Sequence, residues 1–143
     1  MSGIVVGVDG SPHSQAALDW ALDEAALRNA HLTALAVTPA ATGIWGITSQ
    51  FSASQEEQEK VNQAAKDMVD KAVERHGHQQ VTVRTVSGVP ADELIKASRD
   101  ADLLVVAARG AGGFVRLRMG SVSTQVTAHA HCPVVVVQSG ADH

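Results

Sequence analysis

The chain has 143 residues, 45% of them hydrophobic, which suits one domain with a substantial core. Its net charge of −4 argues against general binding to nucleic acid or to anionic membranes. One cysteine, Cys132, excludes an intrachain disulfide, and no apolar run approaches the ~18 residues of a membrane helix. Because no signal peptide is recognisable, we expect a single cytoplasmic domain over residues 1–143.

Strand-like and helix-like segments alternate along the sequence. Ser11-Pro12 marks a helix start, with Ser as N-cap and Pro in the first turn, and Gly77 marks a helix end. Residues 40–52 have no clear period, so we predict a long loop whose Trp45 and Phe51 form either a lid or a small packing cluster. The predicted strands are residues 4–8, 31–37, 80–86, 102–107 and 133–137, and the predicted helices are residues 12–29, 54–76, a short one from 90, and 120–129.

This alternation predicts an α/β fold with a five-stranded parallel sheet and helices on both faces. Crossovers in such sheets are right-handed, and 3-2-1-4-5 is one of the two common doubly wound strand orders; we expect that order here. In that order the winding reverses between the first and fourth strands, where ligands of such folds bind. The turn after the first strand and the loop after the fourth are therefore expected to face each other.

A glycine-rich loop follows the fourth predicted strand and contains three of the seven arginines. Glycine lets backbone N–H groups approach an anion closely, and a helix start after the loop would add more donors. We predict phosphate binding here, the alternative being that the glycines only turn the chain. The loop is neither a P-loop nor a dinucleotide fingerprint, because no Gly-Lys-Ser/Thr follows and the glycines do not follow the first strand. The residues concerned are Arg109, Gly110, Gly112, Gly113, Arg116, Arg118, Gly120 and Ser121.

The turn after the first strand supplies Asp9, Gly10 and Ser11. Asp9 can bond a ligand, or a metal ion through water, or it can simply cap the following helix. The seven histidines include no HExxH pattern, and two pairs spaced two apart, His76/His78 and His129/His131, give little support for a metal site. Cys132 is expected to be a structural thiol.

The chain resembles the universal stress protein family over nearly its whole length. The similar segments are IVVGVDGS near the start, GVPADELI in the third quarter, the loop ending in Gly120-Ser121, and HCPVVVV. The ATP-binding branch of that family carries the motif G-x2-G-x9-G-S/T. Gly110, nine residues and Gly120-Ser121 match its later part, whereas Ala107 stands at the first glycine.

The resemblance implies a Rossmann-like fold of the adenine nucleotide alpha hydrolase type, holding ATP with Mg²⁺ bound through the phosphates. Asp9 matches an acidic residue near the adenosine, and Val37 matches a position whose backbone contacts adenine. Ala107 would weaken binding if its backbone needed a positive φ, and would cost little otherwise. The full set of expected ligand contacts is Asp9, Gly10, Ser11, Val37, Ala107, Arg109, Gly110, Gly112, Gly113, Gly120, Ser121 and Val122.

Three functions remain open at this point. The first is an ATP-binding protein of stress response or signalling with at most weak ATPase activity, since no general base can be named. The second is a dimeric interaction module that binds no nucleotide, as in the other branch of the family. The third is a nucleotide-dependent enzyme such as a transferase. In the first two we expect a homodimer through the apolar edge strand Val134, Val135, Val136 and Val137.

Overall fold

The computed structural model describes residues 3–38, 55–77, 80–109 and 120–138, and these form a three-layer α/β domain. Every predicted helix and strand is present, with ends that differ by a residue or so. The strands are β1 (Ile4–Val8), β2 (Leu32–Thr38), β3 (Val81–Ser87), β4 (Leu103–Ala107) and β5 (Val134–Val137). The helices are α1 (Pro12–Arg28), α2 (Gln55–His76), α3 (Pro90–Ser98) and α4 (Ser121–His129).

The five strands form one parallel sheet in the order β3-β2-β1-β4-β5, as predicted. β1 pairs with β2 up to Val8 opposite Ala36, while β2 continues to Thr38 opposite Ser87 of β3. β2 therefore extends beyond β1 at the carboxyl edge of the sheet. The chain reverses its winding between β1 and β4, so the expected ligand position lies at this edge.

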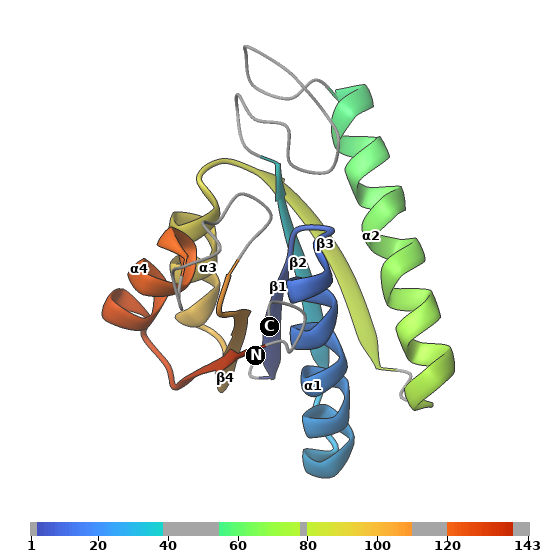
Figure 1. Cartoon of the computed structure of the whole chain (residues 1–143), viewed down its shortest axis with the longest axis horizontal. Helices are drawn as coiled ribbons and strands as arrows, with labels where there is room; N and C mark the ends of the chain where they lie inside the picture. Colours follow the sequence, from blue (N-terminus) through green and yellow to red (C-terminus); the bar gives the residue numbers. More distant parts are fainter. Residues whose placement is uncertain (1–2, 39–54, 78–79, 110–119, 139–143) are drawn as a thin grey trace.

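The helices cover the two faces of the sheet in pairs. Figure 1 shows α1 and α2 on one side and α3 and α4 on the other. The apolar sides of α1 and α2 contribute to the first of two core clusters, and the second cluster lies beneath α3 and α4. In α3 the buried residues are Ala91, Leu94 and Ser98, whereas Ile95 and Ala97 are only half-buried.

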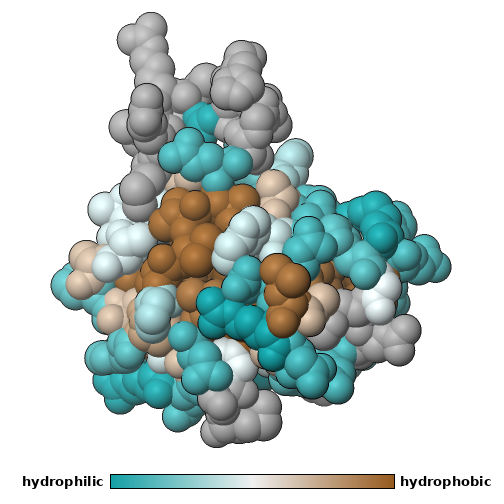
Figure 2. Space-filling model, turned by 90° about the horizontal axis from the view of Figure 1, so that it is seen from below, coloured by the Kyte–Doolittle hydropathy of each residue, from teal (hydrophilic) through white to brown (hydrophobic). Residues whose placement is uncertain are grey.

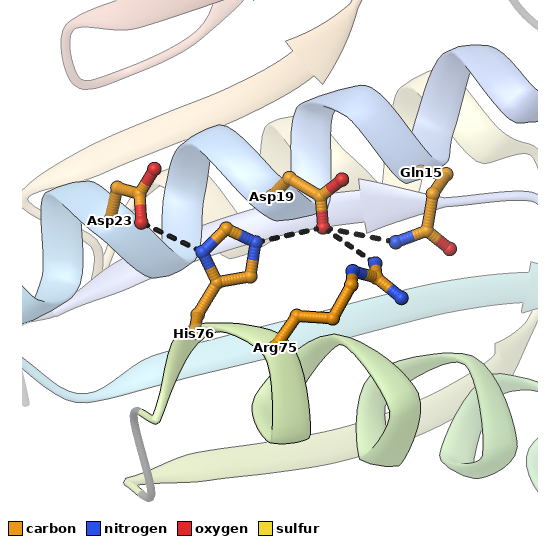
Figure 3. Close-up of polar contacts among 5 residues, drawn as sticks. All are labelled: Gln15, Asp19, Asp23, Arg75 and His76. Carbon is orange, nitrogen blue, oxygen red and sulfur yellow. Dashed lines mark hydrogen bonds and ion pairs between the residues drawn. The ribbon is translucent and has the colours of Figure 1, made fainter.

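A polar network joins α1 to α2 on the outer side of the domain (Figure 3). Oδ1 of Asp19 accepts hydrogen bonds from Gln15 (3.1 Å) and Arg75 (2.9 Å) and lies 3.2 Å from Nε2 of His76. The other ring nitrogen of His76 lies 2.8 Å from Oδ1 of Asp23. His76 thus links the two helices, while His78 lies outside the described residues.

Cys132 contributes to packing, as expected for a structural thiol. It is half-buried and contacts the second core cluster. Burial raises the pKa of the Cys132 thiol, and the neighbouring Asp102 carboxylate raises it further. The thiol therefore stays protonated near neutral pH. Among the described helices, none combines the length and the apolar character needed to cross a membrane.

Candidate functional site

The turn from β1 into α1 is built by three short-range hydrogen bonds. Ser11 is the N-cap of α1, and its side chain accepts the Ser14 N–H at 3.1 Å. Asp9 Oδ1 accepts the Ser11 N–H at 2.9 Å, and Ser14 Oγ accepts the Asp9 N–H at 3.2 Å. Gly10 adopts φ +81°, a conformation that favours glycine. The Asp9 carboxylate is thereby held at the carboxyl end of β1, at the helix N-terminus.

The end of β2 presents backbone groups toward this turn. The Leu32 N–H donates to Gln80 and the Thr38 C=O accepts from Gly88, so even-numbered residues of β2 bond toward β3. In a parallel strand the backbone polar groups alternate between the two neighbours, which directs those of Val37 toward β1. Because β1 pairs only as far as Val8 opposite Ala36, the Val37 C=O lies at the open corner beside the Asp9 turn.

Ala107, at the carboxyl end of β4, is not strained. It is the last residue of β4, pairs with Val137 and has an extended backbone rather than a positive φ. Its side chain packs against the first core cluster, on the same side of the sheet as α1. The methyl group at the first glycine position of the motif therefore imposes no backbone cost. Arg109, half-buried, follows two residues later.

The start of α4 is bound directly to the end of β4. The Gly120 N–H donates to the Ala108 C=O at 2.7 Å, and Ser123 Oγ donates to the same carbonyl at 2.7 Å. Gly120 is the N-cap of α4, and no side chain among the described residues caps this helix. The first-turn N–H groups have no acceptor within the helix, and a helix start of this kind can attract an anion. Ser121 is exposed there, while the Val122 side chain packs into the second core cluster.

The three predicted site segments therefore lie at the carboxyl ends of three consecutive strands of the sheet, β2, β1 and β4. The Asp9 turn follows β1, the start of α4 comes after β4, and Val37 belongs to β2. Gly110, Gly112, Gly113, Arg116, Arg118 and the loop 40–52 lie outside the described residues. The contact of Ser123 with the Ala108 carbonyl was not predicted, because nothing in the local sequence distinguishes Ser123 from its neighbours.

A doubly wound parallel sheet with a helix N-terminus and an acidic turn at its winding reversal defines a Rossmann-like α/β protein. Within that class, the family model described as "Universal stress protein family" matches residues 1–138. The chain therefore belongs to the universal stress protein family.

Known relatives agree with this assignment. A universal stress protein of Mycolicibacterium smegmatis is 38% identical over 141 residues, covering 94% of this chain and 47% of that protein. The chain spans about half the length of the curated relatives it matches.

Solved structures share the fold over nearly the full chain. A universal stress protein solved in complex with cAMP is 27% identical, with a TM-score of 0.66 and coverage of 96% of this chain and 95% of that one. The universal stress protein from Archaeoglobus fulgidus in complex with dAMP has a TM-score of 0.65 at 22% identity, with 95% and 97% covered. The second likeness establishes the fold alone.

Proposed function

We propose that this protein binds an adenine nucleotide, ATP with Mg²⁺, at the carboxyl edge of β1, β2 and β4. The observation that carries the proposal is the start of α4, which is bound to β4 through Ala108 and has no side-chain cap. The first-turn N–H groups of α4, for which the described residues provide no side-chain acceptor, fit a phosphate, and the exposed Ser121 hydroxyl adds a further donor. The 27% identical relative solved with cAMP supports a nucleotide in this fold.

The remaining residues fit the other parts of such a ligand. The backbone of Val37 at the open corner of β2 suits the polar edge of a base, and Asp9 lies between the base and phosphate ends. No cluster of three or more metal-binding side chains occurs among the residues the structure describes, so Mg²⁺ would be carried by the phosphates, with Asp9 contributing through water. We propose a signalling role with at most weak hydrolysis.

Titration calorimetry with Mg-ATP tests this function. We expect saturable binding by the parent protein, and adenine nucleotide in the supernatant after the purified protein is denatured. The absence of heat at millimolar ATP, together with no copurified nucleotide, would contradict the proposal. That result would favour the alternative, a dimeric interaction module without nucleotide, which the departure from the motif at Ala107 suggests. Turnover assays would reveal a transferase.

We also propose that the protein forms a homodimer through β5. β5 is an edge strand of the sheet, and all four of its valines are half-exposed. Figure 2 shows that apolar side chains form a continuous area on one face of the molecule. An uncovered apolar edge strand is prone to pair with other chains, and pairing with a second copy protects both edges.

Replacement of Val135 by Lys is expected to shift the protein from dimer to monomer. Val135 is half-exposed and packs partly against the first core cluster, so pairing of the two copies would bring the ammonium group among apolar side chains and remove it from water, which is unfavourable. Light scattering should give twice 14.9 kDa for the parent and 14.9 kDa for the variant. Leu27→Lys is the matched control, because Leu27 is 84% exposed on α1 and its replacement should leave the mass unchanged. A monomeric parent would refute the dimer.

A further inference from the structure

The hydroxyl of Thr38 is buried without a partner at the end of β2. Thr38 is 3% exposed, and within the described part of the chain its Oγ1 is the only buried side-chain nitrogen or oxygen that makes no hydrogen bond. A buried hydroxyl that leaves water and gains no partner is unfavourable, so native proteins keep few of them. Its presence at this position requires a physical reason.

The other buried hydroxyls of the described residues show that the fold can satisfy such groups. These hydroxyls belong to Ser11, Ser14, Ser98 and Ser123, and each of them makes at least one hydrogen bond of 3.1 Å or less. Thr85 is the closest comparison, because it lies on neighbouring β3 opposite Ala36, near the carboxyl edge. Its hydroxyl donates to Asn62 of α2 at 2.9 Å. Thr38 thus carries the same kind of hydroxyl group as these residues, but among the described residues its hydroxyl has no hydrogen-bond partner.

The position of Thr38 connects it to the candidate site. Alternate residues of β2 from Leu32 to Ala36 contact the first core cluster, and Thr38 continues that series on the same face of the sheet. Ala107 contacts that cluster from β4. β2 lies two strand spacings, about 10 Å, from β4. A ligand whose phosphate lies at the start of α4 would therefore extend its far end toward β2.

We propose that the Thr38 hydroxyl is a hydrogen-bonding contact for the base of the bound nucleotide, an inference that rests on the proposed function. A hydroxyl can donate to a ring nitrogen or accept from an exocyclic amino group, so it suits a heteroaromatic base. The base would supply the hydrogen-bond partner that the described residues do not provide. A site with a buried polar group waiting for a ligand favours ligands that pair with it over those that do not.

Thr38→Val tests this contact, because valine keeps the shape and removes only the hydroxyl. We expect Mg-ATP to bind about 10-fold more weakly by calorimetry, since one hydrogen bond to the ligand is lost. The melting temperature without nucleotide should stay the same or rise, because no unpartnered hydroxyl remains buried. Thr38→Ser keeps the hydroxyl and should bind Mg-ATP nearly as tightly as the parent.

Thr85→Val is the matched control and should behave in the opposite way. It removes a hydroxyl that is already paired with Asn62, so the melting temperature should fall while Mg-ATP binding stays at the parent level. Inorganic tripolyphosphate with Mg²⁺ is the second probe, because it lacks the base. Its affinity should be equal in the parent protein and in Thr38→Val.

The possible failures can be told apart. Equal Mg-ATP affinity in the parent and Thr38→Val overturns the contact and leaves the proposed function intact. Equal losses of ATP and tripolyphosphate affinity also overturn it, because Thr38 would then act through the fold. A parent protein that binds no ATP refutes the proposed function and the Thr38 contact together.

Discussion

Gly120→Val should reduce Mg-ATP binding by at least ~100-fold while leaving the fold intact. Gly120 is the N-cap of α4, where the proposed phosphate contacts begin. A branched side chain at this position would stand beside the first-turn N–H groups and exclude the phosphate oxygens from them. Losing several charge-assisted hydrogen bonds at ~1.5 kcal/mol or more each accounts for an effect of this size. Calorimetry with Mg-ATP measures it directly.

The fold should tolerate this valine because the backbone does not require glycine here. Gly120 has φ −82° and ψ 177°, an extended conformation open to any residue. Its N–H can still donate to the Ala108 carbonyl after the substitution. Ala128→Val adds similar bulk to an exposed position near the other end of α4 and should leave binding unchanged. Binding by Gly120→Val within a few-fold of the parent would place the phosphate elsewhere.

The alternation of strands and helices was predictable because its physical cause is local. Strands covered on both faces are nearly continuous apolar runs, such as Ile4–Val8 and Leu103–Ala107, and their burial matches that expectation. Helix ends were also predictable where one residue decides them, as at Ser11 and Gly77. Given these elements, connection rules leave few topologies, and the observed order 3-2-1-4-5 is one of the two common doubly wound ones.

Other features depend on partners that are distant in the sequence. The extended backbone of Ala107 depends on its pairing with Val137 in β5. The glycine motif ends before β5, so it gives no information about this pairing. Sequence spacing relates His76 only to a histidine two residues away. Its partners in the structure, Asp19 and Asp23, lie on α1, over 50 residues earlier. The missing partner of Thr38 is likewise a property of the folded neighbourhood. The placement of Asp9 and Gly120 at the same edge of the sheet was predictable because it depends on strand order alone: each residue follows one of two neighbouring strands, β1 and β4.

Leu104→Ala should lower the free energy of unfolding by about 3 kcal/mol, within the range of about 2–5 kcal/mol measured for buried leucines. Leu104 has 0% exposure in the second core cluster, on β4 between β1 and β5. Its removal leaves a cavity between strands that are fixed by their hydrogen bonds, including that from the Leu104 N–H to Pro133. Urea unfolding followed by far-ultraviolet circular dichroism measures the loss.

Leu27→Ala is the matched control, because it makes the same chemical change at a position outside the hydrophobic core. Leu27 is 84% exposed on α1, and alanine favours helix slightly more, so the free energy of unfolding should change by less than ~0.5 kcal/mol. Since β4 also carries the start of α4 through Ala108, Leu104→Ala should lower Mg-ATP affinity only when a fraction of the protein unfolds. Equal stabilities of the two variants would contradict the assignment of Leu104 to the core. A loss of affinity in fully folded Leu104→Ala would instead show that packing beneath α4 positions the phosphate site.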